Sequence, residues 1–186
     1  MTKMKKYLIF RLVVFTALAI VIGVMAHQIM PYINYLVGGA MIVYGVEGLI
    51  FSVDRERAHF YKDYQFFLGT IELLLGIIMM TLIKDAPTTC VIWGTWTIVR
   101  ESYELYETSH KIMHHFPAVL SLILSIIEIV FSVLLIVSAS GEYEHHALTH
   151  VYLLIPELII NGISPFLYDL FNSYKAKKKQ KKNKSE

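Results

Sequence analysis

Residues 69–83 read GTIELLLGIIMMTLI, and Glu72 is the only charged side chain in this stretch. With the five residues before it, the stretch forms a mostly apolar run from residue 64 to residue 83. A helix needs about 20 such residues to cross the hydrocarbon core of a bilayer, because no backbone N–H or C=O group finds water there. The run therefore predicts a transmembrane helix.

Five other segments have the same length and character, and the connections between them are too short to form separate domains. We expect six transmembrane helices in all, at about 7–26, 32–53, 64–83, 88–107, 117–139 and 148–171. The predicted fold class is an all-α integral membrane protein. Residues 1–174 form its six-helix bundle, and residues 175–186 form a disordered basic tail in the cytoplasm.

The composition supports this class. Hydrophobic residues make up 55% of the chain and charged residues only 17%, whereas an ordinary soluble domain has about 25% charged residues. This excludes a disordered chain and a conventional soluble protein. The net charge of +2 is unevenly distributed along the chain. Seven of the seventeen bases lie within 175–184, and residues 1–174 carry more acids than bases. The single cysteine, Cys90, excludes an internal disulfide and a cysteine-based metal framework.

The distribution of lysine and arginine predicts the topology, since cytoplasmic loops are enriched in both. With the N-terminus inside, sixteen of these bases fall on the inner side and only Lys84 falls on the outer side. We therefore expect a multi-pass protein of the cell membrane with both termini in the cytoplasm. The first span could also be a cleavable signal peptide, but its long apolar run and the interruption by Arg11 favour a retained helix.

The odd-numbered spans align with one another without gaps. The alignment places small residues at two positions seven apart, which lie on one helical face where backbones can approach closely. The first position holds Thr16, Gly69 and Ser125, the second holds Gly23, Gly76 and Ser132, and between them lie Ala19, Glu72 and Glu128.

The even-numbered spans align likewise. Gly39, Gly94 and Pro156 coincide, followed six residues later by Gly45, Arg100 and Gly162. We interpret the bundle as three tandem helix-hairpin repeats of shared orientation. A chance match between apolar helices with scattered glycines is the alternative.

The residues of this repeat resemble a known family. The runs Gly69–Ile78 and Ile92–Gly94, with Pro87 between them, look like the repeat unit of the HdeD-like (DUF308, short-repeat) membrane proteins, and Tyr35–Gly48 is similar to its second helix. The resemblance extends over residues 7–174. It implies a six-helix inner-membrane protein, associated in enterobacteria with acid resistance, and it supplies no catalytic residues.

Two features depart from the family pattern. Arg100 stands where a glycine is expected, and serines replace glycines in the third repeat. The resemblance therefore does not carry close helix contacts into the last hairpin.

Ionisable residues inside the predicted spans are the candidates for a functional site, because charges in the bilayer are costly and usually face the bundle interior with partners. The helical rise puts Glu47, Glu72 and Arg100 at one level, and Arg100 and Glu104 lie one turn apart. The sixth span adds Pro156, which predicts a kink there. The candidate polar core consists of Glu47, Glu72, Arg100, Glu104, Glu128, Glu157 and Asn161.

This polar core has two interpretations. In the first, Arg100 pairs with a neighbouring glutamate to fix the bundle geometry, and the other glutamates join helices by hydrogen bonds. In the second, the core responds to protons, because carboxylates removed from water take up protons more readily. The repeat-equivalent Glu72 and Glu128 would then form its centre.

Histidines and acids gather at the predicted outer end of the sixth span. This candidate cluster consists of His145, His146, His150, Glu142 and Glu144. Imidazoles beside acids could sense external pH or hold zinc or nickel weakly. The alternative is a hydrated interfacial loop with incidental histidines, and we assign no metal site.

The basic run Lys175–Lys184 predicts attraction to anionic lipid head groups, so the lipid bilayer is the expected partner. Nucleic-acid binding is not expected, because no aromatic or folded reader accompanies the lysines. Assembly into a homo-oligomer stays open.

No nucleophile elbow, HExxH motif or glycine-rich phosphate loop is present, so we expect neither an enzyme nor a cofactor. The resemblance implies a non-catalytic multi-pass inner-membrane protein that supports acid or envelope stress tolerance. The alternative is a proton-coupled transporter or channel for a small solute that uses the intramembrane glutamates. A continuous polar path through the bundle would favour transport, and a dry, closely packed centre would favour the first function.

Overall fold

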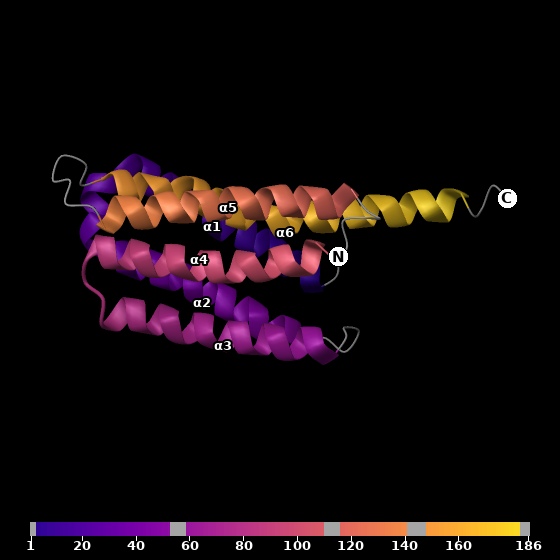
Figure 1. Cartoon of the computed structure of the whole chain (residues 1–186), viewed down its shortest axis with the longest axis horizontal. Helices are drawn as coiled ribbons and strands as arrows, with labels where there is room; N and C mark the ends of the chain where they lie inside the picture. Colours follow the sequence, from indigo (N-terminus) through magenta and orange to yellow (C-terminus); the bar gives the residue numbers. More distant parts are fainter. Residues whose placement is uncertain (1–2, 53–58, 110–115, 141–147, 183–186) are drawn as a thin grey trace.

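The computed structural model describes residues 3–52, 59–109, 116–140 and 148–182. Within these ranges the chain is α-helical and has no strand, which confirms the all-α class (Figure 1). The elements are α1 (Lys3–Ile29), the 3-10 turn η1 (Met30–Tyr32), α2 (Ile33–Ser52), α3 (His59–Thr81), α4 (Ala86–Ser109), α5 (Phe116–Ser140) and α6 (Thr149–Lys182).

The helices lie side by side in a bundle, and the beginning of α1 and the end of α6 lie at the same end of it (Figure 1). We call this the terminal end, and the opposite end, which carries η1 and the α3–α4 connection, the turn end. Each predicted span coincides with one helix to within a few residues at its turn end.

The last helix differs from the expectation for the basic tail. α6 continues to Lys182, beyond the ends of the other helices (Figure 1), so the described part of residues 175–186 is helical. Lysine, alanine and glutamine favour helices, and extending a helix that already exists avoids the cost of nucleating one. α6 also runs unbroken through Pro156. The irregular backbone inside a helix lies instead in α1, at Met25, where φ is −123° and ψ is 23°.

Two stretches of the described residues are long and apolar enough to cross a membrane. They are Leu8–Ile50, which contains most of α1 and nearly all of α2, and Leu122–Ser140 in α5. Phe66–Thr81 in α3 is apolar but shorter. α4 is less apolar because it carries several threonines and three charged residues within five positions, from Arg100 to Glu104.

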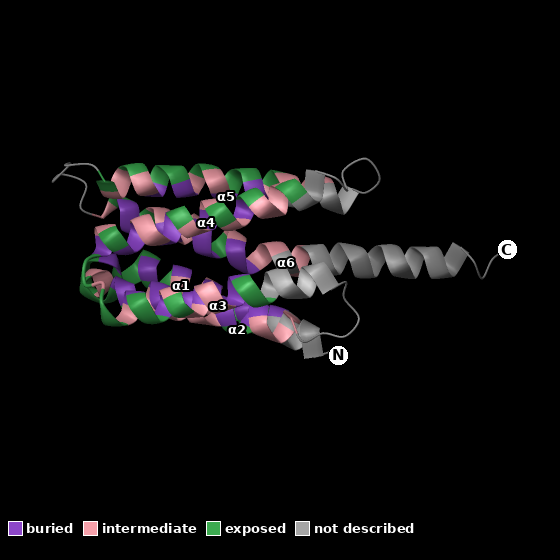
Figure 2. Cartoon of the chain, turned by 60° about the horizontal axis from the view of Figure 1, so that its bottom comes forward, coloured by how far each residue is buried: buried purple, intermediate pink, exposed green. Residues whose placement is uncertain are grey.

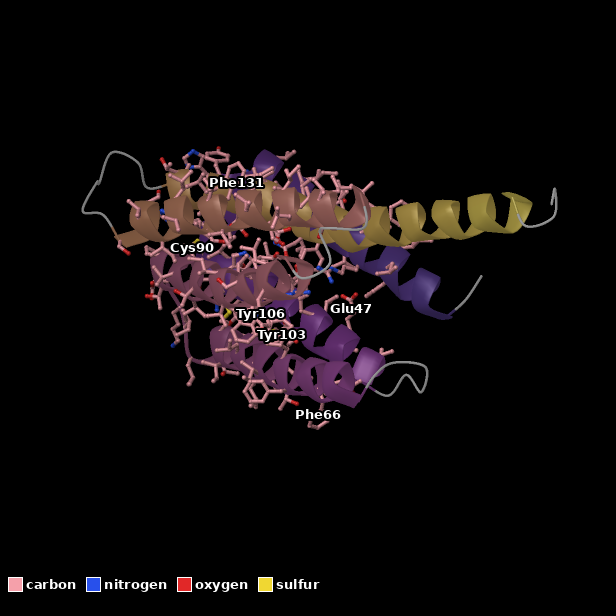
Figure 3. The ribbon with its side chains drawn as sticks, turned by 45° about the vertical axis from the view of Figure 1, so that its right-hand side comes forward. Glu47, Phe66, Cys90, Tyr103, Tyr106 and Phe131 are labelled. Atoms are coloured by element: carbon pink, nitrogen blue, oxygen red, sulfur yellow. The ribbon has the colours of Figure 1, made fainter. Side chains whose placement is uncertain are left out.

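The outer faces of the bundle are apolar. Exposed residues lie along the outside of α5 and on other outward-facing parts of the bundle in Figure 2, and large hydrophobic side chains are exposed on all six helices of the described chain. Val24 is 78% exposed and Leu82 is 71% exposed. Phe66 on α3 points away from the other helices (Figure 3). A soluble helical protein would bury most such side chains.

The closest helix contact joins α2 to α3, and glycines make it possible. A Cβ atom on Gly45 would lie 2.6 Å from the backbone nitrogen of Leu73 and 2.7 Å from the carbonyl oxygen of Gly69. One on Gly38 would lie 2.8 Å from the carbonyl oxygen of Gly76. The predicted close approach at Gly69 and Gly76 is therefore confirmed, with Gly38 as a partner in place of Gly39, which has open space around it.

Two further pairs pack in a similar way, α4 on α5 and α6 on α1. A Cβ on Gly94 would lie 3.0 Å from the carbonyl oxygen of Ser132, and one on Gly162 would lie 3.0 Å from the Cβ of Phe15. By contrast, α1 and α2, which follow each other in the chain, contact each other little. Each of these helices therefore packs mainly on a neighbour from another predicted hairpin.

Candidate polar core

Arg11 lies inside the bundle and joins three helices. Its guanidinium donates from Nη1 to Glu47 Oε2 on α2 at 2.8 Å, and from Nε and Nη2 to the backbone oxygen of Asn161 on α6 at 3.1 and 2.7 Å. Arg11 is only 4% exposed and Glu47 only 7%. Figure 3 shows Glu47 on α2, on the side that faces the rest of the bundle. Sequence reasoning placed Arg11 among the bases of the inner rim, and the structure makes it a central group of the polar core.

The sequence of α6 explains why the Asn161 carbonyl is available. In an α-helix this oxygen would accept a hydrogen bond from the backbone N–H four residues later. That residue is Pro165, which has no N–H to donate. The two donors of Arg11 therefore satisfy a carbonyl that the helix itself leaves without a partner. We expected Pro156 to free a carbonyl in this helix, and the carbonyl that the described contacts use is the one that Pro165 frees.

Tyr44 on α2 connects the two arginines. The Cζ atom of Arg11 lies 4.2 Å from the centroid of the Tyr44 ring, and that of Arg100 lies 4.0 Å from it. Both distances are typical of cation–π contacts. The Tyr44 hydroxyl donates a hydrogen bond to Asn161 Oδ1, and Asn161 Nδ2 donates to the backbone oxygen of Glu157 at 2.9 Å. Tyr44 and Asn161 thus link the α2 side of the core to α6.

Arg100 on α4 pairs with Glu72 on α3. The distance from Arg100 Nη1 to Glu72 Oε1 is 3.5 Å, and the Trp96 indole N–H donates to the same oxygen at 3.2 Å. Glu47, Glu72 and Arg100 were expected to meet at one level. In the structure Glu47 and Glu72 belong to two separate ion pairs. Arg100 takes Glu72, Arg11 takes Glu47, and the Tyr44 ring lies against both guanidinium groups.

Glu157 on α6 lies in a different environment. It is fully buried, and the hydroxyl of Ser132 on α5 donates to its Oε1 at 2.5 Å. Its Oε2 is buried without a hydrogen-bond partner. The indole N–H of Trp93 on α4 lies near this carboxyl group and acts on it electrostatically, outside the geometry of a regular hydrogen bond.

Glu128 on α5 lies one helical turn before Ser132 and therefore on the same face. It is 1% exposed, and its Oε2 has no hydrogen-bond partner. Its charged neighbours are mostly acids, with Arg100 as the base among them. The acidic neighbours of Glu128 are Glu101, Glu104 and Glu157.

The charges of this core do not balance. The buried acids of the described chain are Glu47, Glu72, Glu101, Glu128 and Glu157. Arg11 pairs with Glu47 and Arg100 with Glu72. Within the described chain no ion pair neutralises Glu128 or Glu157, and the charged groups around both are mostly acids.

An apolar layer lies between the polar core and the turn end of α6. The side chains of Val151 and Leu154 lie between His150 and Glu157 on that helix, and both are fully buried in the apolar core. Cys90 on α4 and Leu135 on α5 belong to the same apolar core and are also fully buried. None of these four side chains offers a polar step between His150 and Glu157.

The outer histidine cluster falls largely outside the described residues, since His145, His146, Glu142 and Glu144 lie within 141–147. His150 is described. It is buried, its Nε2 has no hydrogen-bond partner, and its backbone oxygen lies 3.9 Å from the Cys90 sulfur. No group of three or more potential metal ligands occurs among the residues that the structure describes.

The α3–α4 connection at the turn end is held by two side chains. Asn34 on α2 donates from Nδ2 to the backbone oxygen of Ile83 at 2.8 Å, beyond the end of α3. Asp85 caps the start of α4, where the backbone N–H of Thr88 donates to Asp85 Oδ2 at 2.7 Å. Hydrogen bonding to Thr88 lowers the pKa of Asp85 below its ordinary value. A side-chain oxygen that accepts from the third helical N–H is the usual N-cap arrangement.

Sequence reasoning missed several members of the core. Ser132 was noted as a small residue of the repeat, and its role as a donor to Glu157 was not foreseen. Tyr44, Glu101 and Trp96 were not singled out as core residues. A signal existed for Arg11, because an arginine within an apolar run has few ways to be satisfied except by an acid or a freed carbonyl.

Comparison with known proteins gives one family match. The model of the family described as "Short repeat of unknown function (DUF308)" matches residues 13–81, which include most of α1, all of α2 and nearly all of α3. This confirms the resemblance to that family for these helices, over a shorter part of the chain than the 7–174 that the sequence suggested. No curated protein and no solved structure matches the chain.

Proposed function

We propose that this protein is a six-span, non-catalytic protein of the cell membrane, of the short-repeat type, with both termini in the cytoplasm, and that it supports tolerance of acid or envelope stress. The observation that carries the proposal is the inversion of polarity between the inside and the outside of the bundle. Arg11, Glu72 and Glu128 are buried, whereas Val24 and Leu82 are largely exposed. Such an arrangement is stable where the surroundings are hydrocarbon.

The helix contacts support the threefold repeat. Gly45 meets Gly69 in the α2–α3 pair, and the repeat alignment places Gly162 and Thr16 at the corresponding positions of α6 and α1. Gly162 contacts Phe15, the residue next to Thr16. Three equivalent pairs, α2–α3, α4–α5 and α6–α1, would close the bundle into a ring around an axis along the membrane normal.

The interior supports a structural role for most of the polar core. Arg11 and Arg100 each have an acidic partner, and the freed carbonyl of Asn161 is satisfied. The buried side chains of α6 between His150 and Glu157 are apolar. An apolar interior of this kind favours a non-conducting membrane protein over a transporter or channel for protons or a small solute.

The extension of α6 supports a contact with lipid. Lys175–Lys182 continues the helix beyond the terminal end of the bundle, where it would meet the cytoplasmic leaflet. Each base near an anionic surface contributes about 1 kcal/mol of attraction. We propose that this segment holds the orientation of the protein through anionic head groups.

The experiment has two arms. Cells that lack the protein should survive a drop in external pH less well than cells that express it. Proteoliposomes that contain the purified protein and an enclosed pH-sensitive dye should show no more proton flux than empty liposomes. Equal survival with and without the protein would contradict a role in acid tolerance, and protein-dependent flux would contradict a non-conducting protein.

The alternative function is a proton-coupled transporter or channel, and one specific observation favours it. Glu128 and Glu157 are buried, Oε2 of each has no hydrogen-bond partner, and neither forms an ion pair with a base of the described chain. If proton flux occurs and is lost in Glu157→Gln but kept in Glu72→Gln, transport becomes the function that the structure supports.

A further inference from the structure

We propose that Glu157 and Glu128 form a proton-binding site inside the bundle, in which one proton is held on this pair of carboxyl groups when the surrounding solution is neutral. The inference rests on the membrane placement proposed above and deepens it. It assigns a ligand to Glu128 and Glu157, which take part in neither of the two ion pairs of the core. The ligand is a proton, which converts one carboxylate into a neutral carboxylic acid.

The geometry brings the two carboxyl groups onto one surface between α5 and α6. Ser132 donates to Glu157 across this interface at 2.5 Å. Glu128 lies one turn from Ser132 on the same face of α5, and Glu157 is one of its charged neighbours. The serine therefore holds the Glu157 carboxyl group beside the turn of α5 that carries Glu128.

The titratable groups near the pair lie on α4, α2 and α1. On α1, which packs on α6, Arg11 is engaged with Glu47 and with the backbone oxygen of Asn161. α4 contributes Glu101, Glu104 and Arg100, and α2 contributes Tyr44. Arg100 is engaged with Glu72 and with the Tyr44 ring. The remaining charged neighbours are acids, so ionisation of both carboxyl groups would place two negative charges in a region that already has an excess of them.

Two buried carboxylates without a base of their own cannot both stay charged at reasonable cost. The effective penalty for one uncompensated buried charge is several kcal/mol, and like charges that share a site raise it further. A proton removes one charge and also supplies an O–H donor. That donor can satisfy an oxygen that now has no partner, such as Oε2 of Glu128 or Glu157.

A proton suits this site better than a metal ion does. Among the residues that the structure describes, no group of three or more histidine, cysteine, aspartate or glutamate side chains could hold a metal ion. The site offers the carboxyl groups of Glu128 and Glu157 and one hydroxyl, that of Ser132. Divalent cations require more oxygen ligands than these.

The experiment is infrared spectroscopy of the full-length protein in lipid vesicles at neutral pH, in light and heavy water. A protonated carboxyl group has a C=O stretching band that is separate from the carboxylate bands and moves in heavy water. We expect the wild-type protein to show such a band. Glu157→Gln should remove it or reduce it strongly, because one member of the pair is lost and Glu128 can then ionise alone.

Two variants control for unfolding. Ser132→Ala removes only a hydroxyl, so it should keep the bundle intact and shift the band, because the hydrogen bond to Glu157 is lost. Glu72→Gln should leave in place the band that Glu157→Gln removes, because Glu72 lies beside a base, Arg100, and is not a member of the proposed pair. A wild-type protein without the band, or a band that persists in both Glu157→Gln and Glu128→Gln, would overturn the proposal.

Two further measurements distinguish failure of the proton site from failure of the membrane placement, and a bound proton from a bound metal cation. Flotation of the vesicles reports membrane insertion, so a protein that floats with lipid and lacks the band contradicts the proton site alone. A protein that does not float contradicts the membrane placement. Replacing the potassium in the buffer by sodium should not change the band, and loss of the band in sodium would show that a metal cation occupies the site instead.

Discussion

At the scale of single residues, the polar core depends on Arg11. It satisfies the Glu47 carboxylate on α2 and the Asn161 carbonyl on α6. Each of these groups is buried, and each would be left without its donor if the guanidinium were removed. A buried pair contributes little net stability as a whole, but breaking it by removing one partner is strongly destabilising.

We therefore expect Arg11→Gln to lower the free energy of unfolding by about 3–5 kcal/mol. Thermal unfolding in detergent micelles, followed by far-ultraviolet circular dichroism, would measure the effect. The double variant Arg11→Gln/Glu47→Gln should recover part of the loss, because no uncompensated carboxylate then remains at this place. Equal stability of Arg11→Gln and wild type would contradict the assigned role.

A second residue-scale prediction concerns Asp85, the cap of α4. Asp85→Ala should lower stability by about 0.5–2 kcal/mol, the usual effect of losing an N-cap. Because the pKa of Asp85 is lowered in the folded state, its contribution is fully present above the ordinary aspartate pKa of about 3.9. The contribution is lost as the pH falls through the lower folded value.

The difference in melting temperature between wild type and Asp85→Ala should therefore shrink as the pH falls below about 3.9. Asp85→Asn is the matched control, since asparagine is an equally good cap and does not titrate in this range. A difference that grows in acid would contradict the capping role.

Single residues also show where sequence reasoning was limited. The sequence predicted that Glu47, Glu72 and Arg100 would lie in one polar region, because helical rise fixes their level. It did not predict which acid pairs with which base. Arg11 contacts Glu47 and Asn161, which lie 36 and 150 residues away in the chain, and helical rise alone does not indicate which distant helices are neighbours. Pro165, four residues after Asn161, was the available sign that a carbonyl would need a donor.

At the scale of helices, glycines determine which pairs pack closely. Gly45 lies against the backbone of α3, so any side chain there must push the two helices apart. Gly39 lies on the same helix and has open space around it. The two positions differ in packing and hardly at all in helix propensity, which makes them a matched pair.

We expect Gly45→Ala to destabilise the bundle by about 1–3 kcal/mol, as overpacking of a close contact usually does. Gly39→Ala should be neutral or slightly stabilising, because alanine loses less conformational freedom than glycine in a helix. Thermal unfolding of both variants under the same conditions tests this. A larger loss for Gly39→Ala than for Gly45→Ala would contradict the described α2–α3 contact.

The helices themselves were well predicted and their pairing was not. Bilayer thickness gave the expected length of each segment, and each predicted segment corresponds to one helix of the structure. The repeat of small residues identified the packing faces around Gly69 and Gly76, but a face does not name its partner. The structure pairs α2 with α3 and α6 with α1, mainly across the predicted hairpins and not within them.

At the scale of the whole molecule, apolar and charged side chains occupy opposite sides of the helices. Large apolar residues cover the outside and ionisable residues lie inside, in two arginine-centred pairs and one group of acids without a paired base. An alternating bundle of this kind, with the beginning of α1 and the end of α6 at its terminal end, requires an even number of crossings if it spans the membrane.

Labelling of single cysteines in intact cells tests this placement most directly. In a Cys90→Ala background, new cysteines replace Lys84 at the turn end and residues 56 and 112, which lie in the sequence between α2 and α3 and between α4 and α5. A thiol reagent that cannot cross membranes should label position 84 from outside, and should label positions 56 and 112 only after the cells are permeabilised. Labelling of all three positions from outside, or of none in permeabilised cells, would contradict the six-span account.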